Sequence, residues 1–246
     1  MINNDALDSY PRNSKQIEGL VINACFPRSG HRFLRNMVRD YFSSSMVFYE
    51  AHSKGIKSYG DREGLIHNVN YAKTHDFKSE GREVLNGLNL HNRKYLIQIR
   101  HPLESIISWY EFSLKHKTLE VDNRDTWLNF LEQKFSFWKS FYNVWEVNSV
   151  TEDKLLVKYD DLYSNSQAIF SNVIEFLSGD KLVDSSLIKA IVNSQEFLQY
   201  VGDTSSVKNK KREVSEFKYF DLTLFTELET SIMELYLKPA DIKSCL

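Results

Sequence analysis

The sequence predicts an α/β fold in which helices cover both faces of a parallel β-sheet. The first observation is that short apolar runs of strand length alternate with longer segments whose apolar residues recur every three or four positions, a pattern typical of parallel sheets with crossover helices. The second is that two of these runs, at residues 19–26 and 94–100, lead through a tight turn into a helix and bring arginines to the turn. Ligands of open parallel sheets bind at those strand ends.

The elements follow from the same patterns. The runs expected to be strands are residues 19–26, 46–50, 69–73, 94–100 and 154–159. The segments expected to be helices are residues 30–42, 103–116, 125–147, 166–177, 185–193 and 222–237. Asn165 is a good N-cap for the fourth helix. The polar, basic segment 202–216 is expected to be a loop, and the aromatic stripe of helix 125–147 is assigned to the core.

Two of these helices follow the turns that carry arginines. In helix 30–42 the spacing predicts a buried stripe of Phe33, Leu34, Met37 and Tyr41, with arginines on the opposite side. In helix 103–116 two serines, Ser105 and Ser108, fall off the expected buried stripe. We therefore expect both hydroxyls to be free for a ligand or for water.

Composition indicates a single soluble domain. The chain has 246 residues, of which 42% are hydrophobic and 26% charged, so it suits one domain with a sizeable core over residues 1–246, the alternative being two small domains. Residues 1–16 are expected to be a loose N-terminal arm. The net charge of −2 does not suggest a nucleic-acid partner. A polyanionic ligand must therefore be held by local clusters of cations.

The cysteines and the N-terminus predict a cytoplasmic protein. Cys25 lies in an apolar run and Cys245 next to the C-terminus, which is no disulfide framework and fits a reducing compartment. Residues 1–15 lack the apolar centre of a signal peptide. No apolar run approaches the ~20 residues of a membrane span, so no membrane partner is expected.

The turn after the first strand has the chemistry of an anion site. Residues 25–35 read Cys-Phe-Pro-Arg-Ser-Gly-His-Arg-Phe-Leu-Arg. A turn containing Gly30 at a helix N-terminus offers backbone N–H groups, and Arg28 adds a cation. The pattern G-x-x-x-x-G-K-[ST] is missing, which disfavours Mg-nucleotide hydrolysis. The alternative is an ordinary strand–helix turn without a ligand.

Three motifs in order resemble one family. Residues 27–30, Pro-Arg-Ser-Gly, resemble the loop by which sulfotransferases hold the 5′-phosphosulfate of 3′-phosphoadenosine 5′-phosphosulfate (PAPS). Arg100 and Ser108, eight positions apart, resemble the family's 3′-phosphate motif. Between them, residues 73–75, Lys-Thr-His, resemble the segment with the catalytic histidine. The resemblance implies the three-layer, P-loop nucleotide-kinase-like fold of the sulfotransferases, with PAPS as donor and no metal.

The resemblance also assigns residues to the donor. They are Arg28, Ser29, Gly30, His31, Arg32, Phe33, Arg100, Ser108, Lys210, Lys211 and Arg212. His31 and Arg32 stand where the family often has two hydroxyl residues, and the alternative for Arg32 is a solvated side chain. For Arg100 the alternative is a structural ion pair at a strand end. The basic run 208–212 only loosely resembles the family's late loop over the 3′-phosphate, and its alternative is a solvated charge run.

The implied chemistry centres on a histidine. Transfer of a sulfuryl group to an alcohol requires removal of the hydroxyl proton, and an imidazole suits that role. We therefore expect His75 to be the general base, with Glu50 in reserve, and Lys73 and Arg28 to stabilise charge on the transferring group. The alternative for an isolated histidine is a structural role.

The predicted function is PAPS-dependent sulfation of a small-molecule acceptor. The sequence leaves open the acceptor, transfer to oxygen or to nitrogen, and the oligomeric state, a homodimer included. The acceptor pocket is expected to form from residues 49–64, 77–92 and 112–122. Its candidate lining residues are His52, Tyr59, Trp109 and Phe112. The rival hypotheses are a P-loop kinase, which would need a Mg²⁺ site, and a non-catalytic nucleotide-binding protein on the same fold.

Overall fold

The structure is a computed structural model, which describes residues 16–42, 46, 48–52, 55–58, 70–75, 93–145, 147, 153–200 and 213–237. Among these residues one six-stranded sheet has the order β3-β2-β4-β1-β5-β6. The strands are β1 (Leu20–Cys25), β2 (Phe48–His52), β3 (Gly55–Ser58), β4 (Tyr71–Thr74), β5 (Arg93–Ile99) and β6 (Lys154–Lys158). Strand β3 is antiparallel to β2, and the other neighbours are parallel.

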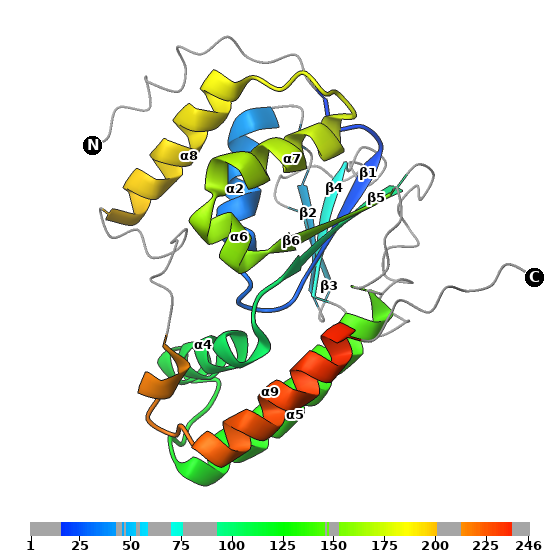
Figure 1. The fold of residues 1–246 in the computed structure, drawn as a ribbon. Coiled ribbons are helices and arrows are strands. Elements are labelled where there is room, and N and C mark those ends of the chain that lie inside the picture. The colour runs from blue at the N-terminus through cyan, green and yellow to red at the C-terminus, as the bar shows by residue number, and fades with distance from the viewer. Residues whose placement is uncertain are drawn as a thin grey trace, which may run out of the picture.

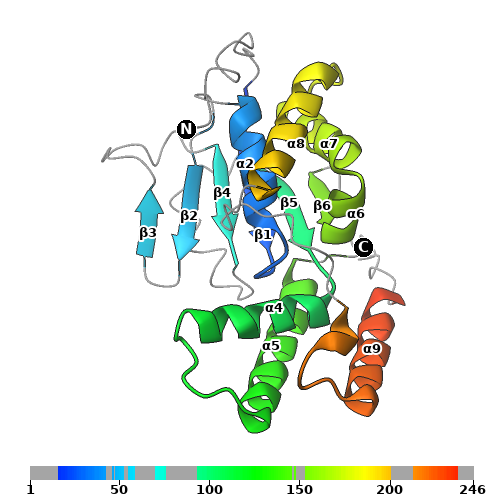
Figure 2. The same cartoon turned by 90° about the vertical axis from the view of Figure 1, so that its left-hand side faces the viewer.

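Helices cover the sheet on both sides (Figures 1 and 2). They are α2 (His31–Phe42), α4 (Pro102–Lys115), α5 (Arg124–Val144), α6 (Tyr159–Ser164), α7 (Ser166–Ser178), α8 (Ser185–Tyr200) and α9 (Leu222–Leu237), with a 3₁₀ turn at Val214–Glu216. Helices α2, α7 and α8 lie together along one side of the sheet, while α4, α5 and α9 gather beyond the end at which the parallel strands finish. The predicted α/β fold, a parallel sheet flanked by helices, is confirmed.

Alternating side chains of the central strand build a core on each face. Val21 packs with Phe33, Leu34 and other residues of α2, α7 and α8. The next residue, Ile22, packs instead with residues of α4, α5 and α9. Successive side chains of a strand point to opposite faces, so one apolar strand serves both cores. The predicted stripe of α2, including Met37 and Tyr41, is buried.

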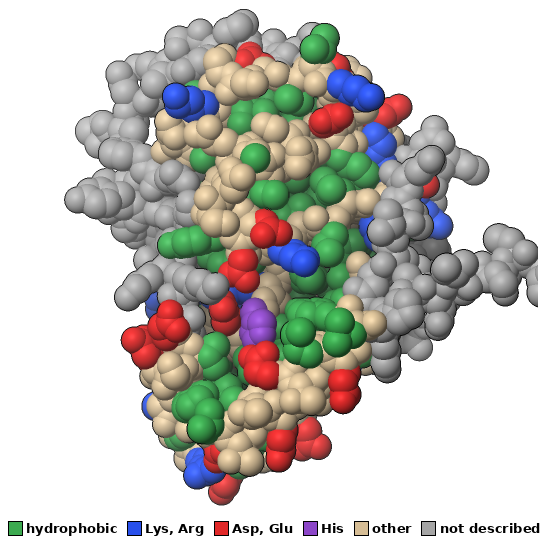
Figure 3. Space-filling model, in the orientation of Figure 1, with side chains coloured by type: hydrophobic (Ala, Val, Ile, Leu, Met, Phe, Trp, Pro, Cys, Tyr) green, Lys and Arg blue, Asp and Glu red, His purple; other side chains and the backbone are tan. Residues whose placement is uncertain are grey.

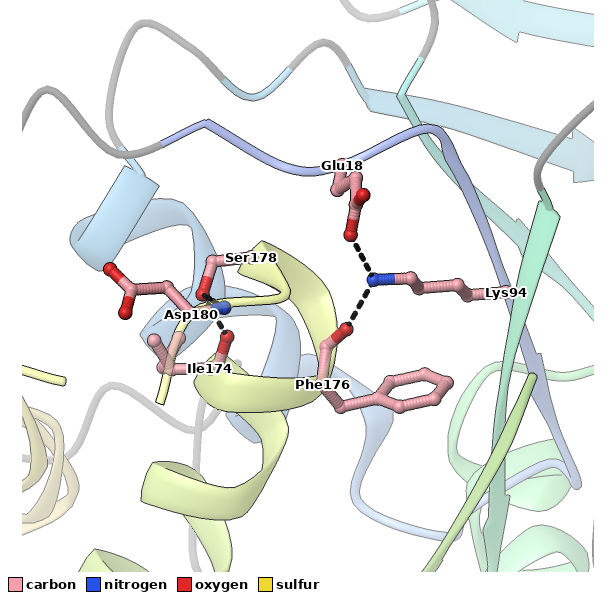
Figure 4. A network of polar contacts seen from close by, with 6 residues as sticks. All are labelled: Glu18, Lys94, Ile174, Phe176, Ser178 and Asp180. Atoms are coloured by element: carbon pink, nitrogen blue, oxygen red, sulfur yellow. Dashed lines mark hydrogen bonds and ion pairs between the residues drawn. The ribbon is translucent and has the colours of Figure 1, made fainter. Parts of the chain in front are cut away.

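A small polar network closes the opposite end of the sheet (Figure 4). Lys94 Nζ, at the start of β5, donates to Glu18 Oε2 over 2.8 Å and to the Phe176 carbonyl over 2.9 Å. The Glu18 N–H donates to the Leu177 carbonyl. Gly179 ends α7 in the left-handed conformation, as helix C-termini favour. These contacts fix α7 against the strands, at the end of the sheet opposite to the carboxyl ends of the parallel strands.

Several local predictions differ from the structure. Strand β3 and the short helix α6 were not predicted, and α8 extends to Tyr200. Part of the segment expected to be a loop forms the 3₁₀ turn at Val214–Glu216. Asn165 does occupy the N-cap of α7, but its side chain makes no capping hydrogen bond.

Ser105 is also placed differently from the prediction. It is 0% exposed, because α4 packs on more sides than a single stripe would. Its hydroxyl oxygen is buried and has no hydrogen-bond partner among the described residues.

The helices were compared with the length and hydropathy that a membrane span requires. None of the helices in the described ranges is long and apolar enough to cross a membrane.

Figure 3 shows one face of the molecule, on which acidic and basic side chains are interspersed among apolar ones. That mixture agrees with a net charge of −2.

Candidate active site

The turn after β1 is held in an unusual backbone conformation. Arg28 has φ +67° and Gly30 has φ +82°, both in the left-handed region that glycine favours. A Cβ atom on Gly30 would lie 2.5 Å from the Tyr159 ring. The side-chain amide of Gln98 donates to the Ser29 carbonyl over 2.9 Å. Strand β5 and the start of α6 therefore shape the turn from both sides.

This turn offers polar groups to an anion. Ser29 is 0% exposed, and its hydroxyl oxygen has no hydrogen-bond partner in the described part of the chain. The first N–H groups of a helix have no partners earlier in the helix. At α2 those of Phe33 and Leu34 donate to the Gly30 carbonyl, which leaves those of His31 and Arg32 as the candidate donors. A phosphate-like oxygen is the kind of ligand that satisfies such donors.

Arg28 links the turn of residues 27–30 to the motif that contains Arg100 and Ser108. Its Nε donates to Ser108 Oγ over 3.1 Å, and its guanidinium lies 4.8 Å from the centre of the Phe112 ring. Burial, together with the nearby charges of Arg32 and Arg100, lowers the pKa of Arg28 from its usual value. The guanidinium keeps its charge at any physiological pH. Neighbouring cations that repel one another create a strong preference for a bound anion.

Arg100 forms an ion pair, which the sequence analysis gave as the structural alternative to phosphate binding. Its Nε and Nη2 lie 3.0 and 2.9 Å from Glu104 Oε2, and its guanidinium stacks 4.5 Å from the centre of the Tyr159 ring. Arg100 and Glu104 are each 6% exposed. One carboxylate oxygen occupies one edge of the guanidinium, which has five N–H donors. The pair thus fixes the direction of Arg100 and leaves it donors for a second anion.

His75 is oriented by the last residue of β1. Thr74 pairs with Ala24 in the parallel register, so the next residues along, His75 and Cys25, also lie side by side. His75 Nδ1 is 2.6 Å from the Cys25 carbonyl oxygen, which can only accept. Nδ1 therefore carries the proton, and Nε2 is the nitrogen that can accept one. This tautomer is the one that a general base needs.

Lys73 and Glu50 lie on neighbouring strands. Lys73 is 2% exposed within β4, and Glu50 of β2 is its partner in the parallel register. The side chain of Glu50 lies outside the described residues. Whether it reaches the site as a reserve base therefore stays a prediction.

His31 lies against His75 at the start of α2. The two rings meet edge to face with their centroids 5.2 Å apart. Burial holds the pKa of His31 well below its usual value, and the charges of Lys73, Arg35 and Arg32 lower it further. His31 is therefore neutral at pH 7. Phe33, in contrast, is 2% exposed within the core, and its N–H donates to the Gly30 carbonyl.

The remaining predicted site residues divide into two groups. Arg32 is exposed on α2, while Trp109 is half-buried on α4. Lys210, Lys211 and Arg212 lie outside the described residues, as do the side chain of His52, Tyr59 and most of the segments expected to hold the acceptor. The predictions on them are untested by the structure.

Sequence reasoning missed four positioning residues: Cys25, Gln98, Glu104 and Tyr159. Only Glu104 carried a readable signal, since an acid four residues after an arginine lies on the same helix face. The other three act through contacts between strands or with the start of α6. No local pattern in the sequence signals such contacts between distant segments.

Comparison with known proteins decides the fold. No protein-family model and no curated protein sequence matches this chain. Among solved structures, mouse sulfotransferase SULT7A1 complexed with PAP superposes with a TM-score of 0.62 at 17% identity, covering 94% of this chain and 88% of that one. The protein has the sulfotransferase fold.

A second known protein has the same fold. Retinol dehydratase in complex with retinol and PAP gives a TM-score of 0.56 at 13% identity, covering 93% of this chain and 84% of that one. Its complex with androsterone and inactive cofactor PAP gives 0.51 at 12% identity, over 89% and 81% of the two chains. The expected resemblance to the sulfotransferases is thus confirmed at the level of the fold.

Proposed function

We propose that this protein is a PAPS-dependent sulfotransferase that transfers a sulfuryl group to a small-molecule acceptor. The observation that carries the proposal is the convergence of three segments far apart in the sequence. Residues 27–30, His75 and Arg100 follow the neighbouring strands β1, β4 and β5, and Arg28 bonds to Ser108 across 80 residues of chain. The sulfotransferase fold of the neighbours supports this proposal.

The donor would bind at its two ends. Ser29, Gly30 and the N–H groups at the start of α2 would hold the 5′-phosphosulfate, with Arg28 and Arg32 supplying charge. Arg100 and Ser108 would hold the 3′-phosphate, because a guanidinium pairs well with phosphate oxygens. The buried, unpartnered hydroxyl of Ser29 fits such a ligand. Lys210, Lys211 and Arg212 are proposed to close over the 3′-phosphate.

The chemistry is an in-line exchange in which the S–O bond of the donor is replaced by an S–O or S–N bond to the acceptor. PAPS supplies an activated sulfuryl group, whose S–O bond to the 5′-phosphate breaks as the bond to the acceptor oxygen or nitrogen forms. His75 Nε2 takes the acceptor proton, and Lys73 and Arg28 stabilise negative charge on the transferring group and the departing phosphate. Positioning and charge stabilisation account for most of the catalysis in such transfers. No metal has a role in this scheme.

The acceptor is proposed to be small, with a hydroxyl or amine group. The dehydratase structures named above contain retinol and androsterone, and a comparable pocket here would lie beside Phe112 and Trp109. We place the protein in the cytoplasm as a single domain of residues 1–246. The two cysteines, which form no disulfide framework, support this location.

The direct test is a transfer assay with PAPS labelled in its sulfuryl group. A panel of phenols, alcohols and amines is incubated with the labelled donor, and sulfated product is separated and counted. We expect transfer to at least one acceptor class, its loss in His75→Ala, and normal transfer in Cys245→Ser as the control. Phosphate transfer from Mg·ATP without any sulfuryl transfer would replace this proposal with the kinase hypothesis.

A further inference from the structure

Three side chains capable of binding a transition metal meet at the proposed active site, and one of them is the proposed base, His75. Cys25 is the last residue of β1, His31 the first of α2, and His75 follows β4. One ligand atom from each lies within 4.8 Å of the others. From these observations we propose that Cys25, His31 and His75 form an inhibitory zinc site. A metal bound there would prevent the imidazole of His75 from acting as the general base.

The geometry fits a tetrahedral ion. Cys25 Sγ lies 3.5 Å from His75 Nδ1. Zinc binds thiolate at about 2.3 Å and imidazole nitrogen at about 2.0–2.1 Å, so two such ligands on a tetrahedral ion stand about 3.5 Å apart. The ligand atom of His31 lies within 4.8 Å of the other two, and it would move closer on binding the ion. The set is already close to the arrangement of a bound metal.

The ligand types favour zinc over magnesium or calcium. A thiolate and two imidazoles are soft or borderline ligands, whereas Mg²⁺ and Ca²⁺ prefer oxygen. Three protein ligands leave a fourth position for water or an anion. Cys25 is fully buried, but both histidines are half-buried, and the metal can enter from their side.

The surrounding charges set the affinity. Lys73, Arg32 and Arg35 act on His31, and they would repel a divalent cation. The thiolate of Cys25 offsets only part of that repulsion. We therefore expect dissociation constants on the order of micromolar, weaker than those of closed structural zinc sites. Such an affinity suits reversible inhibition and not a resident metal.

The inhibition follows from the hydrogen bond of Nδ1. In the metal-free site the Nδ1 proton is donated to the Cys25 carbonyl. A metal at Nδ1 replaces that proton and breaks the bond that orients the ring. This part of the inference rests on the proposed function, because His75 must be the base for its capture to stop the reaction. Metal binding itself does not depend on any reaction.

The test uses Co²⁺ as a spectroscopic substitute for zinc, added to the metal-free protein of residues 1–246 without donor or acceptor. Thiolate–Co²⁺ charge transfer gives a near-ultraviolet band, which should saturate with one equivalent of metal. The band should be lost in Cys25→Ser and Cys25→Ala, and Co²⁺ affinity should fall at least about tenfold in His31→Ala, which removes one of three ligands. Cys245→Ser and His101→Ala are the matched controls and should bind as the wild type does. Thermal melts identify any variant that fails to fold.

Each outcome has a definite consequence. No band in the wild type, or a band that survives in Cys25→Ala, would overturn the zinc site and leave the proposed sulfotransfer intact. In the transfer assay, Zn²⁺ should inhibit the wild type, EDTA should restore activity, and His31→Ala should need at least about ten times more Zn²⁺ for the same fractional inhibition. Co²⁺ binding without inhibition by Zn²⁺ would overturn the inhibitory role. Normal Co²⁺ binding by a protein that transfers no sulfuryl group would contradict the proposed function alone.

Discussion

Arg28 and Ser108 are joined by a hydrogen bond of 3.1 Å from Nε to Oγ. The bond links the turn after β1 to the middle of α4, and its two residues come from the motifs proposed for opposite ends of the donor. The half-buried guanidinium of Arg28 also lies near the charges of Arg32 and Arg100, which lower its pKa, and near the charge of Glu111, which raises it. Three arginines gathered around one carboxylate favour the binding of an anion.

The first prediction concerns recognition of the 3′-phosphate by Arg100. Replacing it alone would leave Glu104 buried without a partner, so the change is made as Arg100→Ala in a Glu104→Gln background. Relative to Glu104→Gln alone, binding of PAP, the desulfated product of PAPS, should weaken by ~1.5–3 kcal/mol, the range for a hydrogen bond to a charged group. Calorimetric titration measures the loss. Adenosine 5′-phosphosulfate lacks that phosphate, and an equal loss for this ligand would show that Arg100 is not its partner.

The second prediction concerns the backbone at Gly30. Gly30→Ala must hold alanine at φ +82° and push aside the Tyr159 ring, so it should lose at least ~1–2 kcal/mol of stability as well as PAP binding. Gly179→Ala is the matched control. It has φ +68° and meets the carboxylate end of Glu18, so it should lose stability with little change in PAP affinity. Similar PAP affinities for both variants, in calorimetry on folded protein, would contradict the role of this turn.

The third prediction concerns the general base. His75→Ala should reduce turnover by ~10²–10⁴-fold, the usual value of general acid–base catalysis, with donor affinity nearly unchanged. Because the base works only when neutral, the wild-type rate should rise with pH as the imidazole loses its proton. Lys73→Ala should instead be slower at every pH, since it supplies charge and no proton transfer. The measurement is the single-turnover pH–rate profile, and a His75→Ala enzyme with the same rising limb would make Glu50 the next candidate.

The fourth prediction concerns acid stability at the junction of α4, α5 and the segment before α9. Asp122 binds Lys218, and its Oδ1 accepts from the hydroxyls of Tyr110 and Tyr219. The hydrogen bond from Lys218 is the main cause that lowers the pKa of Asp122. The stability that it supplies is therefore present above the carboxyl's unfolded pKa and is lost as pH falls through the lower folded pKa.

The variant Asp122→Asn tests that junction. It should melt a few degrees lower than the wild type at pH 7, and the difference should shrink as the pH falls into the acid range. The control is Asp125→Asn, a neighbouring acid in the first turn of α5. Melting curves followed by circular dichroism give the answer, and a difference that does not vary with pH would show that the charge of Asp122 is not responsible.

The fifth prediction concerns metals. Sulfuryl transfer as proposed needs no Mg²⁺, so activity should survive EDTA, and it should increase if the purified protein carries inhibitory zinc. Loss of activity on chelation, with recovery on adding Mg²⁺, would instead favour the kinase hypothesis.

Much of the fold was predictable because its main elements are long and periodic. The helix at residues 222–237 was predicted at its observed bounds, and α2 differs by one residue. Strand β3 was missed because Gly-Ile-Lys-Ser has one large apolar residue and no alternation. Helix α6 has six residues, too few to show a helical period, and it begins where the strand before it was expected to end.

The site was predictable only in part, for a similar reason. Arg28, Ser108 and His75 stand in short motifs that follow strands, so topology brings them together once the sheet is parallel. The partner of Gly30 is Tyr159, more than a hundred residues away, and the proton of His75 is directed by a backbone carbonyl. Such contacts depend on strand register and leave no local pattern in the sequence.

The measurement that tests the central claim most directly is calorimetric competition between PAP and Mg·ATP for the wild-type protein. The proposed contacts of Arg100 and Ser108 with a 3′-phosphate predict that PAP binds ~10–100-fold more tightly, which corresponds to ~1.5–3 kcal/mol. The proposed contact of Arg28 with the 5′-phosphate also predicts that Arg28→Ala weakens PAP binding, while Arg39→Ala, which changes an exposed arginine of the following helix α2, does not. Tighter binding of Mg·ATP than of PAP, or equal PAP affinity in the two variants, would contradict the account.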